Sequence, residues 1–305
     1  MSRTSAVSTQ KQVITDDSRA PRAARWQWRL RGANLTGVGA VTVSLLAILS
    51  GVGASAVAPH DPVEQDIINR LTPPAFQEGG STRNLLGTDH LGRDVLSRLI
   101  YGARVAVLVG VTTVLFSGSL GLIIGLIAGY FGGIADTLLM RLLDVQLSMP
   151  FMLLSLAIIG VLGPSLSNIV IVLAITGWVV YARVIRAEIL SLRTREFVIA
   201  SRALGGSTVR TIVRHLLPNV VPFVIVIATL EVGRVMLLES ALSFLGLGVR
   251  PPTPSWGAML AEGRIYVGTA WWLATFPGLA ILVTVLSLNI VGDWLRDLLD
   301  PELEV

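Results

Sequence analysis

Long apolar runs are the feature that most constrains this chain, because about 20 such residues give a helix the length to cross a lipid bilayer. Six stretches meet this condition or come close to it: Leu35–Ala58, Ala103–Tyr130, Leu138–Leu162, Leu166–Tyr181 (reaching Ile185 if Arg183 snorkels), Val220–Leu247 and Trp271–Val291. The composition agrees, since 52% of the 305 residues are hydrophobic and only 14% are charged, too few to cover a soluble core of this size. The sequence predicts an all-α polytopic membrane protein with six transmembrane helices.

The distribution of basic residues predicts which ends of the helices face the cytoplasm. Seven of the 24 basic residues precede the first apolar run, and seven more lie between positions 183 and 214. Cytoplasmic loops carry an excess of arginine and lysine, so we expect both clusters, and with them both termini, in the cytoplasm. Basic clusters that flank spans fit this bias better than a groove for DNA or RNA, and no nucleic-acid partner is expected.

The same reasoning divides the chain into regions. We expect a cytoplasmic tail at 1–31 (disordered at its start), a first transmembrane helix at 32–58, an extracytoplasmic segment at 59–102, a core of five transmembrane helices at 103–298 and a cytoplasmic tail at 299–305. A cleaved signal peptide ending at Ala54-Ser55-Ala56 is the alternative for the first helix. Its apolar run of 24 residues is longer than the roughly 7–15 of a signal peptide, so an uncleaved helix is favoured.

Two patterns predict local packing. Gly121, Gly125 and Gly129 recur every four residues and place small residues on one face of the second helix, where another helix can approach closely. In the extracytoplasmic segment, an apolar stripe has helical spacing, and it consists of Leu91, Val95, Leu96, Leu99 and Ile100, with Arg93, Asp94, Ser97 and Arg98 on other faces. We expect a separate amphipathic helix at the outer membrane surface, either inert or used for docking or gating.

The basic loop between the fourth and fifth helices is the most informative stretch. Thr194 can cap a short helix that has Glu196 in its first turn, where the helix dipole favours an acid. Gly205-Gly206 would end this helix, and Ser207 would cap the next one. One face of the short helix is apolar and small, formed by Phe197, Ala200, Ser201 and Leu204. The residues alone allow either a solvated basic loop or a lever that fits a cleft on a cytoplasmic partner.

Residues 196–218, EFVIASRALGGSTVRTIVRHLLP, resemble the EAA loop of ABC importer permeases. The small pair of that motif is Ala200-Ser201, its glycine is Gly205, and Leu217-Pro218 opens the next span. Ile199 replaces the acid that the family has just before the small pair, although Glu196 matches another acid common in this subfamily.

Four further stretches resemble the C-type permease subunit of dipeptide, oligopeptide and nickel importers. They occur in the order LLGTDHLGRDVLSRLIYGAR (85–104), GYFGGIADTLLMRLLD (129–144), ESALSFLGLGVRPPTPSWGAML (239–260) and GDWLRDLLDP (292–301). The resemblance covers residues 30–301 and implies the six-helix fold of type I ABC importer permeases. It also implies an extracytoplasmic segment between helices 1 and 2 and a cytoplasmic coupling helix between helices 4 and 5.

The resemblance implies a set of partners. They are a second homologous permease, two cytoplasmic ABC ATPases, an extracytoplasmic substrate-binding protein and membrane lipid. Within the EAA loop at 194–218, the coupling helix would contact an ATPase through Arg195, Glu196, Phe197, Ala200, Ser201, Arg202, Leu204 and Gly205. ATP and Mg²⁺ would be bound by the ATPases, because this chain has no G-x-x-x-x-G-K-[ST] motif and its single lysine, Lys11, lies in a tail.

We therefore expect a non-catalytic subunit without a cofactor of its own. A metal site is not expected either, because the three histidines lie far apart, at positions 60, 90 and 215, and the chain has no cysteine.

Three ionisable residues fall inside the fifth apolar run. Glu231 and Arg234 are three residues apart and can pair on one helix face; Glu239 lies about 12 Å further along the axis and matches an acid usual in the subfamily. Charged groups within a span are expensive and usually face the bundle interior or water. They form either a structural pair that holds helices together or part of the translocation pathway.

The function that we expect is half of the translocation pathway of an ATP-driven importer of dipeptides or oligopeptides in the cytoplasmic (inner) membrane. Nickel chelates, glutathione-like peptides and opines are alternative substrates within the same family. An ion-coupled secondary transporter is the alternative from another class, but no clear internal repeat supports it.

Overall fold

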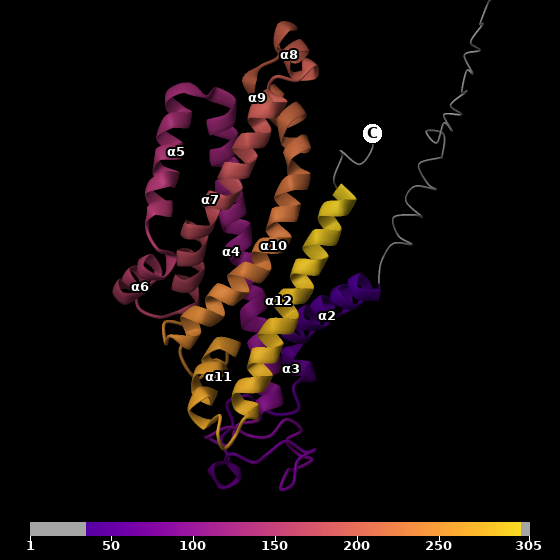
Figure 1. Ribbon diagram of the computed structural model, residues 1–305, viewed down its shortest axis with the longest axis vertical. Helices are drawn as coiled ribbons and strands as arrows, with labels where there is room; N and C mark the ends of the chain where they lie inside the picture. Colours follow the sequence, from indigo (N-terminus) through magenta and orange to yellow (C-terminus); the bar gives the residue numbers. More distant parts are fainter. Residues whose placement is uncertain (1–34, 300–305) are drawn as a thin grey trace, which may run out of the picture.

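The computed structural model describes residues 35–299, so most of both predicted tails lies outside the described residues. In this part of the chain every regular element is a helix, and the long helices run side by side along the long axis of the molecule (Figure 1). Residues 59–94 form loops at one end of the bundle, and a short helix, α8 (Glu196–Ala203), lies at the other. This arrangement separates the predicted extracytoplasmic segment from the predicted coupling helix.

The first half of the described chain contains one helix that crosses the whole bundle. The order is α2 (Leu35–Val52), α3 (Ala54–Val57), a 3-10 turn (Ile67–Asn69), α4 (Val95–Phe131), α5 (Gly133–Ser148) and α6 (Phe151–Leu162). Asp94 begins α4 by accepting a hydrogen bond from the Ser97 amide at 2.8 Å. α5 and α6 are bent by 88° at the break between them, which contains Pro150, and proline disfavours helical backbone at the residue before it.

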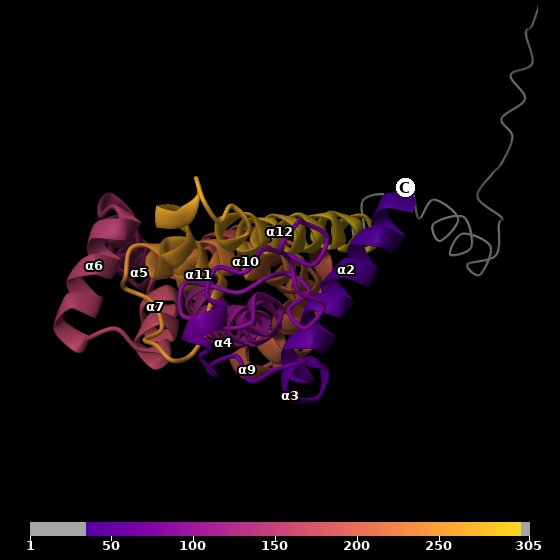
Figure 2. The same ribbon diagram turned by 90° about the horizontal axis from the view of Figure 1, so that it is seen from below.

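The second half contains three more long helices. The order is α7 (Leu166–Leu192), α8, α9 (Thr208–Thr211), a π-helical segment (Ile212–Leu216), α10 (Leu217–Phe244), α11 (Trp256–Gly263), a 3-10 turn (Arg264–Tyr266) and α12 (Trp272–Leu299). Seen end-on, α5 and α6 lie on one side of the bundle and α2 on the opposite side, with α4 between them (Figure 2).

Four helical stretches among the described residues are long and apolar enough to cross a membrane: Val95–Phe131, Leu166–Leu192, Thr208–Phe244 and Trp272–Leu299. The bent pair α5–α6 makes a fifth candidate, and α2 is a shorter apolar helix. Large apolar side chains cover much of the outside, for example Phe116 at 66% and Val161 at 87% exposed, as expected for surfaces facing lipid or another membrane subunit. The count of six spans and the orientation of the termini stay predictions.

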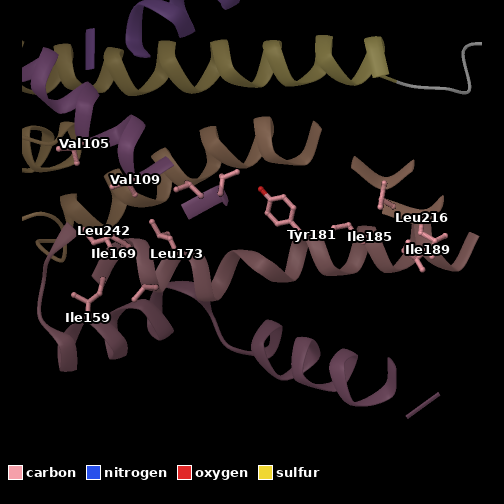
Figure 3. Close-up of a cluster of buried hydrophobic side chains, with 14 of the residues drawn as sticks. Val105, Val109, Ile159, Ile169, Leu173, Tyr181, Ile185, Ile189, Leu216 and Leu242 are labelled. Atoms are coloured by element: carbon pink, nitrogen blue, oxygen red, sulfur yellow. The ribbon is translucent and has the colours of Figure 1, made fainter. Parts of the chain in front are cut away.

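The α4–α7 pair is the central contact of the bundle, and the glycine stripe makes it possible. A Cβ atom on Gly121 would lie 2.5 Å from the Trp178 carbonyl oxygen, and one on Gly129 would lie 2.7 Å from Cβ of Ile189. The close approach predicted from the glycine spacing is thereby confirmed. Around it, a core of fully buried apolar side chains joins α4, α7 and α10, among them Val109, Ile185 and Leu242 (Figure 3).

The structure differs from the sequence-based expectation at the start of α4. We expected a separate amphipathic helix over residues 91–100 and a span beginning at Ala103, but one helix runs from Val95 to Phe131. The apolar residues Val95 and Leu99 pack into the core around Trp256 and Trp272 instead of lying on a membrane surface. The helical prediction is confirmed for residues 95–100 and wrong for residues 91–94, which form a turn before α4. The burial of the charged side chains between the apolar positions was not anticipated.

Candidate functional site

The short helix of the EAA loop forms where the sequence predicts it, with a different first residue. α8 covers Glu196–Ala203, with Arg195 rather than Thr194 at its N-cap and no side-chain cap. The Thr194 hydroxyl instead donates a hydrogen bond to the Ser191 carbonyl at 2.8 Å, so the capping role expected of Thr194 is wrong. Val198 is fully buried and fixes the helix to the core of the bundle.

The glycine pair ends α8 as predicted. Gly205 adopts φ +80°, a left-handed conformation that glycine enters without strain. The Gly206 amide donates to the Ser201 carbonyl at 2.9 Å, which reverses the chain. Ser207 then accepts a hydrogen bond from the Arg210 amide at 3.3 Å and caps α9, also as predicted. The residues of the motif therefore form two short helices, α8 and α9, joined by a glycine turn at one end of the molecule.

The side chains of α8 divide between the bundle and the surface. Phe197 lies 6.3 Å from the His215 ring, and the Arg202 guanidinium lies 4.7 Å from the ring centre of Tyr130, which belongs to α4. Leu204 is 89% exposed and Ile199 is 55% exposed, and Arg195, Glu196 and Ala200 also lie on the surface. An apolar helix surface bordered by charges is thus presented beyond the ends of the long helices (Figure 1).

The three ionisable residues of α10 occupy two separate environments. Glu231 is buried and accepts hydrogen bonds from Nε of Arg234 at 2.9 Å on both carboxylate oxygens, whereas the Arg234 side chain is 46% exposed. Glu239 is fully buried and accepts hydrogen bonds from the hydroxyls of Ser243 at 2.6 Å and Ser240 at 3.4 Å. The structure brings Glu231 and Arg234 together and leaves Glu239 apart in a pocket of serines.

A buried ion cluster at the opposite end of the bundle was not anticipated. Asp89 accepts hydrogen bonds from Nε of Arg93 at 2.7 Å and from Arg98, and both arginines also donate to Glu262 at 3.0 Å. Asp89, Arg93 and Arg98 are each at most 5% exposed. Burial acts to raise the pKa of Asp89, but Arg98 and Arg93 outweigh it and hold the pKa below its ordinary value. The cluster ties the loop before α4 to α11.

The cluster also brings together three groups of the kind that bind metals. Ligand atoms of Asp89, His90 and Glu262 lie within 4.8 Å of one another, although the histidine spacing had suggested no such site. Both carboxylates already pair with arginines, and the His90 ring stacks on Tyr266 at 5.7 Å. Two guanidinium charges beside two carboxylates leave no net negative charge for a cation, so the group forms an ion-pair cluster.

The sequence signal for this cluster was the spacing Asp89, Arg93, Arg98. Arg93 lies four residues after Asp89, yet only Arg98 is on α4; Asp89 and Arg93 lie in the preceding turn, where the Asp89 amide donates to the Arg93 carbonyl at 3.0 Å. The sequence analysis placed Arg93 and Arg98 on the polar faces of a surface helix that began after Asp89, so the contact was not predicted.

Comparison with known proteins places these features in a family. Residues 121–305 match the binding-protein-dependent transport system inner membrane component family. The chain is 46% identical over 277 residues to a di/tripeptide transport system permease protein, DppC, of Pseudomonas aeruginosa, with 91% of each chain covered. It is 44% identical over 302 residues to the dipeptide transport system permease protein DppC of Escherichia coli, covering 98% of this chain and 99% of the relative.

Two further similarities agree with this. The nickel transport system permease protein NikC of Escherichia coli is 41% identical over 281 residues, covering 92% of this chain and 96% of the relative. A chain of the MetNI methionine ABC transporter in an inward-facing conformation has the same fold, with a TM-score of 0.54, 18% identity, and coverage of 67% of this chain and 96% of that one. The chain therefore belongs to the family of inner membrane components of binding-protein-dependent transport systems.

Proposed function

We propose that this chain is the permease subunit of an ATP-driven importer of dipeptides or short oligopeptides in the inner membrane. Dipeptide permeases at 42–46% identity over most of the chain support the substrate class. The observation that carries the mechanism is α8, a short helix with an exposed apolar surface at the end of the bundle opposite the loops of residues 59–94. A helix of this kind suits docking into a groove of a cytoplasmic ATPase.

The proposed assembly contains a second homologous permease, two cytoplasmic ABC ATPases and an extracytoplasmic substrate-binding protein. ATP and Mg²⁺ belong to the ATPases, and the termini of this chain lie in the cytoplasm. The loops of residues 59–94 and α11, fixed to each other by the Asp89–Arg98 cluster, would form the surface that receives the binding protein.

In the proposed mechanism, this chain converts closure of the ATPases into movement of its transmembrane helices. When the ATPases close on ATP, each groove carries its coupling helix with it as a rigid body, and the attached helices turn the pathway outward. Moving such an equilibrium from 1:99 to 99:1 needs a differential free energy of about 5.5 kcal/mol, which ATP binding to the partner subunits supplies.

The pathway is proposed to include the Glu231–Arg234 pair. Both carboxylate oxygens of Glu231 accept from Nε of Arg234, and the Arg234 side chain is 46% exposed on α10. A half-exposed guanidinium within a span is too costly to leave in lipid, so it faces water or a polar partner. Its charge suits the terminal carboxylate of a peptide. Glu239, enclosed by serines, is assigned to the packing of the same helix.

The test is reconstitution of the purified complex in proteoliposomes with a candidate binding protein. We expect the chain to purify with a second permease and P-loop ATPases, and a dipeptide-loaded binding protein to stimulate ATP hydrolysis and peptide uptake. Stimulation by a nickel chelate but by no peptide would move the substrate to the alternative in this family. A chain that purifies alone, with gradient-driven uptake, would overturn the proposal in favour of a secondary transporter.

A further inference from the structure

Two arginines, one at the end of α7 and one in α8, contact the same turn of α4. Arg193, which precedes α8, donates from Nη1 to the Gly129 carbonyl oxygen at 3.1 Å. Arg202, in the last turn of α8, holds its guanidinium 4.7 Å from the ring centre of Tyr130, the next residue along α4. Positive charge is favourable at the C-terminal end of a helix. The C-terminal turn of α4 is therefore contacted by one arginine just before α8 and by another in the last turn of α8.

α8 has few other connections to the bundle. It buries the Val198 side chain and pairs the Phe197 ring with His215, while most of its surface is exposed. On its C-terminal side the chain continues through Gly205-Gly206, and Gly205 has no heavy atom within 4 Å of where a Cβ would be. The Gly205 and Gly206 amides bond back to the Arg202 and Ser201 carbonyl oxygens of this loop. The contact between Arg202 and Tyr130 is a separate connection, and it leads from α8 directly to α4.

The packing of α4 suits this helix to transmit a displacement of α8. Tyr130 packs against the central core, and α4 lies so close to α7 that a Cβ on Gly125 would be 2.9 Å from the Ala182 carbonyl oxygen. Close-packed interiors have low compressibility and transmit strain. From its C-terminal turn α4 runs without a break to Val95, beside the ion cluster of Asp89 and Arg98. One helix thus joins the coupling end of the molecule to the opposite end.

We propose that Tyr130 is a positioning residue that transmits the movement of α8 to α4 through its cation–π contact with Arg202. This rests on the proposed function, in which an ATPase moves α8. Tyr130 touches neither substrate nor nucleotide; it sets how much of the displacement of α8 reaches the spans.

The experiment measures peptide uptake per ATP hydrolysed in the reconstituted complex, for Tyr130→Leu, Tyr130→Phe, Arg202→Gln and the double variant Tyr130→Leu/Arg202→Gln. Cation–π contacts near a surface change an equilibrium by about two- to five-fold. We expect Tyr130→Leu and Arg202→Gln each to lower the uptake-to-hydrolysis ratio by about that factor. Tyr130→Phe, which keeps the aromatic face, should retain the ratio of the unmodified complex, and the double variant should be no worse than either single one.

The outcomes separate this inference from its alternatives. An unchanged ratio for Tyr130→Leu, or losses that multiply in the double variant, overturns it; multiplied losses would mean that Arg202 acts through the ATPase alone. If the Tyr130→Leu complex fails to assemble, the test uses Arg202→Gln in the Tyr130→Phe chain instead. This variant should still assemble, because Arg202 is exposed and its side chain is not part of the core. Gly205→Asp serves as the uncoupled reference. If that variant uncouples and the Tyr130 and Arg202 variants do not, only this inference fails; if the unmodified complex shows no peptide-stimulated hydrolysis, the proposed function fails.

Discussion

Gly205 joins a backbone requirement to a surface position. Its φ is +80°, and a Cβ there would meet no heavy atom within 4 Å. Gly205→Asp therefore costs the strain of a left-handed residue, about 1–2 kcal/mol, and leaves the bundle packed, while it adds a charged side chain beside the exposed surface of α8. We expect the variant complex to assemble and hydrolyse ATP but to import little peptide, measured as uptake and hydrolysis in proteoliposomes.

Gly246→Asp is the matched control, because Gly246 has φ +81° and equally open surroundings but follows α10 at the other end of the bundle. It carries the same backbone strain without altering the surface beside α8. Import at the normal rate by Gly205→Asp would contradict the coupling role of this loop.

Asp89 shows how a single buried charge holds several elements. Asp89→Asn would leave Arg93 and Arg98 with one carboxylate, that of Glu262, in a nearly buried site. Breaking a buried pair by removing one partner destabilises by about 3–5 kcal/mol. We expect a marked drop in the thermal unfolding temperature of the purified complex. Glu78→Gln is the control, because Glu78 is an exposed carboxylate whose loss should change stability by less than about 0.5 kcal/mol.

The same residue predicts a pH dependence. Arg98 and Arg93 hold the pKa of Asp89 below its ordinary value against the opposing effect of burial. A carboxyl group with a lowered pKa stabilises the folded state fully above its unfolded pKa of about 4. This contribution is lost as the pH falls below that value through the folded pKa. The Asp89→Asn variant should therefore lose less stability than the unmodified chain on acidification from pH 5, and equal losses in both would contradict this assignment.

At the scale of helices, replacing glycine by alanine should have different effects on stability in the glycine stripe of α4 and in α6. A Cβ on Gly121 would lie 2.5 Å from both the Trp178 carbonyl oxygen and Cβ of Tyr181, whereas one on Gly160 of α6 would meet nothing within 4 Å. Gly121→Ala should force α4 away from α7 and destabilise by about 1–3 kcal/mol. Gly160→Ala should be neutral or stabilising by up to about 1 kcal/mol, because alanine favours helix. Thermal unfolding of the two variants checks this, and equal effects would contradict it.

The elements were predictable from the sequence where one pattern decided them. The glycines at every fourth position gave the close α4–α7 contact, and Gly205-Gly206 gave the end of α8, because sterics act locally in both. The boundaries were harder, since the helices continue past the apolar residues: α7 runs to Leu192 and α12 to Leu299. Helical hydrogen bonding does not require apolar side chains, so hydropathy marks the membrane-embedded part better than the helix.

The functional residues were predictable to a smaller extent. The helix and the turn of the EAA loop were predicted correctly, while the contact of its residues with an ATPase stays a prediction. Arg202 was expected to contact an ATPase, and the structure places it over Tyr130, 72 positions away. Glu262, the second carboxylate of the ion cluster, is separated from Arg93 by 169 positions. Contacts of this kind depend on how distant helices are arranged, which no local pattern contains.

For the whole molecule, three groups of paired charges among the described residues lie at different levels along the long axis of the bundle. The Asp89–Arg98 cluster lies at one end and Arg186 pairs with Asp136, at 2.7 Å, toward the other. Between them, within α10, lies the Glu231–Arg234 pair, in a helix whose outer side chains such as Ile225 and Leu237 are otherwise apolar. The half-exposed Arg234 is therefore a feature of α10 that needs a polar partner in addition to Glu231.

The double variant Glu231→Gln/Arg234→Met decides whether that partner is the transported peptide. The change removes both charges at once, so no unpaired buried charge remains to disturb folding, whereas Arg234→Met alone would leave the buried Glu231 without its partner. If Arg234 meets the peptide carboxylate, losing a charged hydrogen bond of about 1.5–3 kcal/mol should weaken apparent affinity by about tenfold or more. Uptake by proteoliposomes measures this as a rise in KM for dipeptides, and the loss should be smaller for dipeptides with an amidated C-terminus. Complex yield and ATPase activity without peptide should stay unchanged. Unaltered uptake kinetics for every peptide would assign the pair to helix packing and remove it from the pathway.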